Sequence, residues 1–322
     1  MRTRSLALPL LVALSLGSGG CIKKLMVDGQ IQATRSAAPS VDTIGDLDVG
    51  RGGALAGLVQ FEGMHALSPD NTDALFLLTK TWAGYAFGFV EDDMEAAQDA
   101  GDDDLAEYHQ KRARMAYDRA VFYGLQLLAQ KASGFEEAKK SEQTLAKWLN
   151  DHFTSASDAP DLFWTGYAWL ARGSLMRGDE DEGPQFIAEL YVAIAIIERA
   201  VALDPAAEHY SGLIALAAYH ARNGMAEPEE AKKLFDTVFA KTQGKSLIVQ
   251  LAYAQMYACM KGDAATYQDM LNKVIQAKDP DPEQRLENAI AKKRAKRWLG
   301  KKRAKDHCGI DVGGPAPAKA SK

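Results

Sequence analysis

The 322-residue sequence predicts an all-α fold, in which helical hairpins stack into a solenoid that forms a single elongated domain. Apolar residues recur with helical spacing from residue 54 to residue 299, and no stretch alternates apolar and polar residues as a half-buried strand would. A Trp-x-Gly-Tyr-Ala motif occurs twice, once at Trp82 and again at Trp164. Because internal repetition is typical of repeat architectures, the two copies predict equivalent helices in different hairpins.

The spacing of large and small residues in these hairpins is that of tetratricopeptide (TPR) repeats. Each Trp-x-Gly-Tyr-Ala motif ends on a small residue, Ala86 or Ala168, beside which a partner helix can pack closely. The second-helix pattern is a small residue, a large apolar residue four positions later, and an apolar or small residue three positions after that. Five sets follow it, the last without the small residue: Gly57, Phe61 and Met64; Ala113, Tyr117 and Ala120; Ala193, Ile197 and Ala200; Ala231, Phe235 and Val238; and Tyr267, Leu271 and Val274. We therefore expect TPR-like hairpins over residues 54–300, with these side chains in the core.

The composition excludes several classes of protein. Lys and Arg number 38 and Asp and Glu 43, a formal net charge of −5 that argues against a nucleic-acid-binding protein. Hydrophobic residues make up 47% and charged residues 25%, as in ordinary folded domains, so global disorder is excluded. Three cysteines are too few for a disulfide-rich scaffold or a structural zinc cluster.

The first 20 residues are typical of a secretory signal peptide. Arg2 and Arg4 precede an apolar run over residues 6–16, and small residues follow that run. The run is too short to span a bilayer as a helix. We therefore predict a signal peptide over residues 1–20.

Cys21 directly follows this segment, an arrangement that resembles a bacterial lipoprotein signal. Cleavage would leave the cysteine as a lipidated N-terminus, so we predict lipidation of Cys21. The alternative is a secreted protein cleaved near Gly19, with Cys21 as a free thiol. No aspartate follows the cysteine, so retention at an inner membrane is not signalled and we expect the outer membrane. Residues 30–53 are rich in Ser, Ala, Asp and Gly, and we interpret residues 21–53 as a tether.

Several segments depart from the repeat pattern. Residues 91–104 and 177–183 are expected insertions, and an extra helix is expected near residues 136–153. Nine of the fourteen residues from 292 to 305 are Lys or Arg. We interpret this run as a solvated terminal helix; the alternatives are contact with anionic lipid headgroups or with an acidic partner surface. Residues 301–322 are expected to form a basic, disordered tail.

The sequence contains no motif for catalysis or metal binding. Its six histidines include no pair at zinc-helix spacing, and HExxH, GxSxG and glycine-rich phosphate loops are missing. We therefore expect no enzyme activity, no catalytic residue, no metal site and no cofactor. The acidic run Asp102–Asp104 lacks the Gly and the closing Glu of a calcium loop, and we predict that it caps a helix over residues 105–130.

Cys259 and Cys308 are the two cysteines other than Cys21. In an oxidising compartment they could form a disulfide. The alternative is a buried Cys259 and a separate, exposed Cys308. Both alternatives stay open from the sequence.

A series of segments in order along the chain resembles the TRAP-transporter-associated TPR lipoproteins, the TatT component family. The resemblance covers residues 55–299, and its individual segments are specific only through their order and spacing. They are Ser68–Asn71, Gly84–Val90, Tyr117–Ala120, Tyr123–Leu125, Phe163–Trp164, Glu198–Ala200, Leu203–Pro205, Ala231–Phe235, Gly244–Lys245, Arg285–Asn288 and Ala295–Leu299.

The resemblance implies a periplasm-facing lipoprotein, held at the membrane by its N-terminal lipid, that serves a TRAP-type uptake system. Its implied partner is the periplasmic solute-binding protein, with or without a small ligand, and some family members form oligomers around a pore, so a homo-oligomer is a further expectation. No motif marks a ligand-contacting residue, so the ligand-binding residues are unknown. The alternative is a general envelope scaffold lipoprotein that mediates protein–protein assembly without a small ligand.

Overall fold

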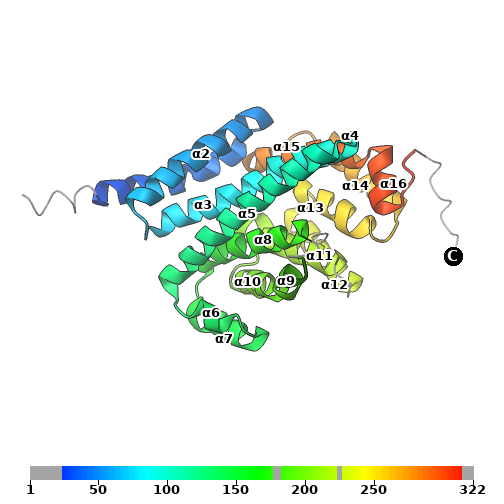
Figure 1. Ribbon diagram of the computed structural model, residues 1–322. Coiled ribbons are helices and arrows are strands. Elements are labelled where there is room, and N and C mark those ends of the chain that lie inside the picture. Colours follow the sequence, from blue (N-terminus) through cyan, green and yellow to red (C-terminus); the bar gives the residue numbers. More distant parts are fainter. Residues whose placement is uncertain (1–23, 177–182, 223–226, 314–322) are drawn as a thin grey trace, which may run out of the picture.

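The computed structural model describes residues 24–176, 183–222 and 227–313 (Figure 1). Every regular element in these ranges is a helix. After a helix over residues 24–37, the elements are η1 (Ala38–Thr43), α2 (Leu47–Leu67), α3 (Thr72–Tyr85), the π-helix η2 (Ala86–Val90), α4 (Glu91–Ala100), α5 (Asp103–Lys131), α6 (Phe135–Ala138), α7 (Glu142–His152), η3 (Ala156–Asp158), α8 (Ala159–Leu175), α9 (Gly183–Ala188), α10 (Leu190–Leu203), α11 (Ala207–Arg222), α12 (Pro228–Thr242), α13 (Leu247–Ala252), the π-helix η4 (Tyr253–Ala258), α14 (Ala264–Gln276), η5 (Pro282–Gln284), α15 (Arg285–Trp298) and α16 (Lys301–Cys308). The signal peptide, Cys21 and residues 177–182 lie outside the described residues. None of the helices in the described ranges has the length and apolar character needed to cross a membrane.

Helices that follow one another along the chain pack side by side, which confirms the all-α, solenoid-like prediction. α2 packs on α3, α3 on α5, α5 on α8, α8 on α10, α10 on α11, and α11 on α12. The extra helix expected near residues 136–153 is present as α6 and α7, which lie at one end of the molecule in Figure 1. The more specific assignment of these hairpins to the TPR class stays a prediction.

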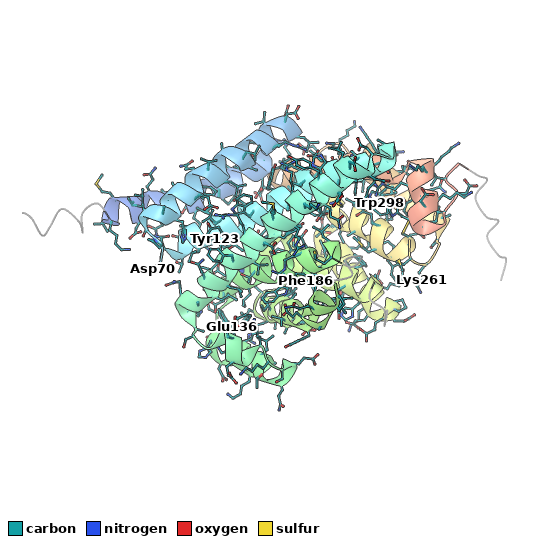
Figure 2. All side chains as sticks on the ribbon, in the orientation of Figure 1. Asp70, Tyr123, Glu136, Phe186, Lys261 and Trp298 are labelled. Atoms are coloured by element: carbon teal, nitrogen blue, oxygen red, sulfur yellow. A yellow bond between two sulfur atoms is a disulfide. The ribbon has the colours of Figure 1, made fainter. Side chains whose placement is uncertain are left out.

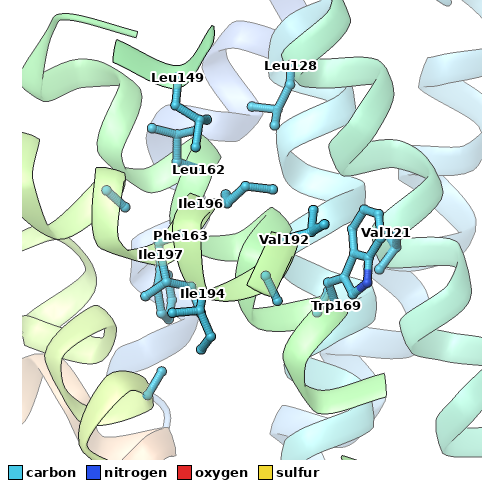
Figure 3. Packing of buried hydrophobic residues seen from close by; sticks show 14 of the residues in the cluster. Val121, Leu128, Leu149, Leu162, Phe163, Trp169, Val192, Ile194, Ile196 and Ile197 are labelled. Carbon is cyan, nitrogen blue, oxygen red and sulfur yellow. The ribbon is translucent and has the colours of Figure 1, made fainter. Parts of the chain in front are cut away.

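The predicted core positions are buried. All large residues of the five second-helix sets are at most 9% exposed, and the small residues Ala86 and Ala168 of the Trp-x-Gly-Tyr-Ala motifs are fully buried. Figure 3 shows the centre of the largest cluster, where Ile196 and Ile197 of α10 pack near Leu162 and Phe163 of α8. Apolar side chains at helical spacing therefore hold the array together, as the sequence pattern predicts.

The two copies of the motif differ in what surrounds their glycine. A Cβ on Gly166 would lie 2.7 Å from Ile197 Cγ1 and 3.0 Å from the Ala193 carbonyl oxygen. α10 can therefore approach α8 this closely only because residue 166 has no side chain. A Cβ on Gly84, at the same motif position, would meet nothing within 4 Å.

The prediction of a tether over residues 21–53 is wrong for its described part. Residues 24–37 form a helix whose Ile31 is fully buried in a cluster with Phe61 and Leu75 of α2 and α3. Arg35 forms ion pairs with Asp73 and Asp161. The polar composition misled the prediction because these residues supply ion pairs, turns and helix caps rather than a solvated linker.

The prediction of a disordered tail is wrong as far as residue 313. Lys301–Cys308 form α16, and Ile310 and Val312 after it are 2% and 6% exposed. A disulfide joins Cys308 to Cys259, with 4.7 Å between the two Cα atoms. The structure thus selects the disulfide over two separate thiols. These apolar and covalent contacts give the basic segment a fixed place.

The acidic stretch 91–104, expected as an insertion, is an ordered part of the array. It forms α4 and then the N-terminus of α5, where Asp102 accepts a hydrogen bond from the Leu105 N–H, as the predicted helix cap requires. The four carboxylates Glu91, Asp92, Glu95 and Asp99 of α4 face the basic residues of α15 and α16.

These charges form one buried ion network between α4, α15 and α16. Arg294 Nη2 lies 2.8 Å from Glu95 Oε1, and Arg303 Nε lies 2.7 Å from Asp99 Oδ1. Arg294 and Arg303 are 6% and 3% exposed, so the interpretation of residues 292–305 as a solvated helix is wrong for them. The acidic surface that the basic run contacts belongs to the same chain. A buried guanidinium needs such carboxylate partners because water is not available to solvate it.

We predict opposite effects of alanine at the two motif glycines. Gly166→Ala should lower the free energy of unfolding by about 1–3 kcal/mol, because its methyl group would collide with Ile197 and the α10 backbone. Gly84→Ala, the matched control, should raise it by up to about 1 kcal/mol, because alanine favours a helix interior and the space is open. Urea denaturation of both variants checks this. If both variants changed the free energy of unfolding equally and in the same direction, the approach of α10 to α8 at residue 166 would not be tight.

Candidate functional site

Half-buried ionisable and aromatic side chains gather where the two ends of the array meet, since α15 packs against η1 and α2. We call this group the central cluster. Its members come from six elements spread over the chain: Asp42 of η1, Lys80 of α3, Phe87 of η2, Trp164 and Tyr167 of α8, Glu208 of α11, and Glu287 of α15. The sequence contributes one or two residues from each element, so the cluster exists only in the folded chain.

Lys80 is the cation of the central cluster. Its Nζ lies 2.9 Å from Glu208 Oε2 and 3.9 Å from Asp42 Oδ2, and it stands 5.5 Å from the centre of the Trp164 ring. Desolvation would lower the pKa of Lys80, but the charges of Glu208 and Asp42 outweigh it and raise the pKa. Lys80 therefore stays charged and is shared between two carboxylates.

Glu287 adds a third carboxyl group beside this single ammonium. Burial and, to a smaller extent, the charge of Asp42 raise the pKa of Glu287 to about 7. Burial also raises the pKa of Asp42. Near neutral pH, Glu287 is therefore partly protonated and can either donate or accept a hydrogen bond.

The backbone that presents Glu208 is strained. Glu208, His209 and Tyr210 have φ angles of 48°, 57° and 67°, so three successive side-chain-bearing residues occupy the left-handed region. This conformation costs about 1–2 kcal/mol per residue outside glycine. The Ser211 hydroxyl donates to the Glu208 carbonyl oxygen at 2.5 Å, which gives this segment one compensating contact. Backbone strain of this kind is typically found at functional sites.

Aromatic rings form the other half of the central cluster. Tyr167 lies 6.2 Å from Phe87 and 5.9 Å from Trp164 between ring centres, both edge to face. Burial, together with the charge of Glu91, raises the pKa of Tyr167, so its hydroxyl is neutral. The buried Nε1 of Trp164 has no hydrogen-bond partner. An unpaired N–H donor thus lies next to Lys80 and the aromatic rings.

The ion network borders the cluster on its aromatic side. Arg294 stands 4.9 Å from the centre of the Phe87 ring and 3.3 Å from Glu91 Oε2. Glu91 Oε1 accepts a hydrogen bond from the Tyr117 hydroxyl at 2.5 Å. The ion network and the central cluster are therefore in direct contact, through Arg294 and Phe87.

The chemistry available here is that of binding. The central cluster offers a charged amine, a carboxyl group that titrates near neutral pH, an unpaired indole N–H and flat aromatic surfaces. These groups suit a small polar solute with an apolar part. Among residues 24–176, 183–222 and 227–313, no group of three or more His, Cys, Asp or Glu side chains could hold a metal ion.

The family is shown by comparison with protein-family models. Residues 44–305 match the model described as TRAP transporter T-component. The chain belongs to this family. The match confirms the resemblance drawn from the ordered sequence segments, and T-components are accessory parts of a transport system. No curated protein matches this T-component significantly.

Sequence reasoning did not identify the central cluster of the T-component. The site residue predicted from sequence, Cys21, lies outside the described residues. A signal was nevertheless present, because three of the segments that carry the family resemblance contain Phe87, Trp164 and Glu287. Their convergence depends on the fold, which brings residues 80, 164, 208 and 287 together.

We predict that Glu287 makes the stability of the T-component depend on pH. Its folded-state pKa of about 7 exceeds its ordinary value of 4.5, so the folded protein holds an extra proton between these values and loses stability as pH rises through this window. Glu287→Gln should remove this pH-dependent loss of stability. It should therefore raise the free energy of unfolding at pH 8 by about 1–3 kcal/mol.

Urea denaturation at pH 5 and pH 8 measures the effect. Glu283→Gln is the matched control, because Glu283 is exposed to solvent. This variant should leave the pH dependence of stability unchanged. An unchanged difference between pH 5 and pH 8 in Glu287→Gln would show that Glu287 titrates normally.

Proposed function

We propose that this T-component is a lipid-anchored, periplasm-facing accessory protein that binds the periplasmic solute-binding protein of its TRAP transporter. Family membership supports the role in transport. The signal-peptide pattern ending at Cys21 supports a lipid anchor, and the lack of an aspartate after it supports the outer membrane. The single observation that carries the interaction with a partner protein is the outer face of α2.

The outer face of α2 carries no exposed charge from residue 52 to residue 67. Its exposed residues are Gly52, Gly53, Leu55, Ala56, Val59, Gln60, Gly63, Ala66 and Leu67. Val59 and Leu67 are 77% and 70% exposed. The one acidic or basic residue of this stretch other than histidine, Glu62, pairs with Arg119 of the same chain. A continuous uncharged face of this length is typical of a protein-binding surface.

Three glycines of this face strengthen the argument. A Cβ on Gly52, Gly53 or Gly63 would meet no atom of the chain within 4 Å. Each glycine in a helix interior costs about 1 kcal/mol relative to alanine, and packing within the chain does not require it here. A partner that approaches the α2 backbone closely would account for them.

The central cluster supports a second part of the function, the binding of a small solute. Its strained Glu208 segment and the three carboxyl groups around Lys80 lower stability, as is typical of sites kept for binding. The solute would be held between Lys80, the Trp164 N–H and the aromatic rings. The alternative function, a general envelope scaffold without a small ligand, would use the α2 face alone.

The lipid anchor is tested by Cys21→Ala. Removing the thiol removes the attachment point, so the variant should move from the membrane fraction to the soluble periplasmic fraction. Fractionation followed by immunoblotting measures the distribution, and Cys308→Ala serves as the control for a cysteine that carries no lipid. Membrane retention of Cys21→Ala equal to that of the natural protein contradicts the anchor.

The partner surface is tested by a charge on α2. Val59→Lys should abolish capture of the solute-binding protein from periplasm, because a lysine ammonium in an apolar interface loses its hydration. Met260→Lys, at another exposed apolar residue (57% exposed), should leave capture unchanged.

Mass spectrometry of the captured material separates the alternatives. Recovery of the solute-binding protein and a retained small molecule supports the transport role. Recovery of envelope-assembly proteins alone favours the scaffold. Light scattering on the same samples shows whether the α2 face instead joins two copies of this chain.

A further inference from the structure

Three exposed apolar side chains lie at the end of the molecule opposite α16, where the helix over residues 24–37 begins (Figure 1). They are Leu25 and Met26 in the first turn of that helix and Leu67 at the end of α2, and we call them the tip patch. They are 73%, 70% and 70% exposed, and among the large apolar side chains of the described residues only Val59 is more exposed. Exposed apolar side chains that lie together mark a surface that contacts another protein or a membrane.

Hydrogen bonds hold the two parts of the tip patch together. Lys24 Nζ donates to Ser68 Oγ at 3.3 Å. Asp28 Oδ1 accepts hydrogen bonds from Ser68 Oγ at 2.7 Å and from Asn71 Nδ2 at 2.8 Å. Because Leu67 directly precedes Ser68, it lies beside the first turn of the helix. The tip patch is therefore a fixed surface of the fold.

The helix over residues 24–37 presents apolar residues on two sides. Ile31 is fully buried among side chains of α2 and α3, and Val27 packs against the same cluster. Leu25 and Met26 lie on other sides of the helix, since successive residues are about 100° apart around its axis. Packing within the chain accounts for Ile31 and Val27 but not for Leu25 and Met26.

The sequence before this helix indicates what faces the tip patch. Cys21, the proposed lipid attachment site, stands three positions before Lys24. Three residues span at most about 10 Å, even when they are fully extended. The headgroup layer between the hydrocarbon region and water is itself about 5–8 Å thick. A lipid on Cys21 would therefore hold the first turn of the helix at the bilayer surface.

The charges at this end do not favour an anionic surface. Lys24 lies 3.8 Å from the Asp28 carboxylate, and Asp70, labelled in Figure 2, adds an exposed carboxylate in the turn after α2. Apolar contact is then the main attraction to lipid, and each buried Leu or Met side chain favours docking roughly tenfold or more. Because the anchor makes docking intramolecular, a few side chains are enough.

We propose that the tip patch docks on the bilayer surface, with Leu25, Met26 and Leu67 inserted among the lipid headgroups. The inference rests on the proposed lipidation of Cys21, and it adds a fixed orientation of the array. Leu67 ends both the outer face of α2 and the tip patch. The proposed partner surface therefore starts at the membrane and continues along α2 for about 20 Å.

The test couples the unlipidated mature chain, residues 21–322, to vesicles through a maleimide-bearing lipid. Cys21 is its one free thiol, because Cys259 and Cys308 form a disulfide. Chemical coupling replaces the native anchor, so the result does not depend on whether the cell lipidates Cys21. The vesicles contain phosphatidylethanolamine, phosphatidylcholine and a small share of a lipid with a photoreactive diazirine near its headgroup.

Mass spectrometry then maps the residues to which the diazirine lipid attaches on illumination. Attachment is expected within residues 24–30 and 66–71. The second segment is the informative one, because it is remote from Cys21 in the sequence and reaches lipid only if the tip patch docks. Residues 105–122 of α5, which include the exposed Met115 and Phe122, should stay free of lipid.

A double variant tests the apolar contact. Leu25→Ser combined with Met26→Ser should lower attachment at residues 66–71 about tenfold or more, because two apolar side chains no longer favour docking. Met115→Ser combined with Phe122→Ser is the matched control. These residues are 67% and 57% exposed, and their loss should leave attachment unchanged.

The proposal is overturned by any of three results. The first is attachment at residues 66–71 no greater than at residues 105–122, and the second is unchanged attachment in the folded Leu25→Ser, Met26→Ser variant. The third is attachment that disappears as the vesicles are loaded more densely, which would assign the tip patch to a contact between copies of this chain. Membrane retention of Cys21→Ala in cells would instead contradict the native anchor alone.

Discussion

The buried ion network between α4 and the α15–α16 pair is the interaction on which the rest of the structure depends. Arg294 contacts Glu91 and Glu95, and desolvation of its guanidinium is outweighed by these charges, which raise its pKa. Loss of one partner from such a buried pair typically costs about 3–5 kcal/mol, because the other charge stays buried. The network converts an open stack of hairpins into one whose ends are joined. A solenoid stabilised only by neighbouring repeats would not need it.

Joining the ends determines what lies between them. α15 carries Glu287 to the Lys80 and Asp42 side chains and Arg294 to the Phe87 ring, so the same helix closes the array and completes the central cluster. Stability gained from the ion network and the apolar core offsets the strain at Glu208 and the repulsion among carboxyl groups. A T-component can therefore keep an unfavourable polar centre without losing its fold.

Much of the fold could be predicted from the sequence, because helical spacing of residues such as Ala193 and Ile197 reports local packing. The ordered segment before α2 and the ordered end after α15 could not be predicted. Their order comes from long-range contacts, such as that of Ile31 with Phe61 and the disulfide between Cys308 and Cys259. The acidic and basic runs were visible as separate features, but their pairing is a long-range property. The central cluster could not be predicted for the same reason. Its left-handed segment Glu208–Tyr210 contains no glycine, so the sequence gives no sign of this backbone conformation.

The pairing of residues 91–99 with residues 294–303 also sets the order of events during synthesis. Contacts such as Arg294–Glu95 join positions 199 residues apart, and such non-local contacts form late because a long loop must close first. While a ribosome still holds the C-terminal helices, α4 exposes a row of carboxylates with nothing to neutralise them. The nascent chain therefore exposes an acidic surface that is buried and neutralised in the complete protein. A truncated product would keep that acidic surface permanently.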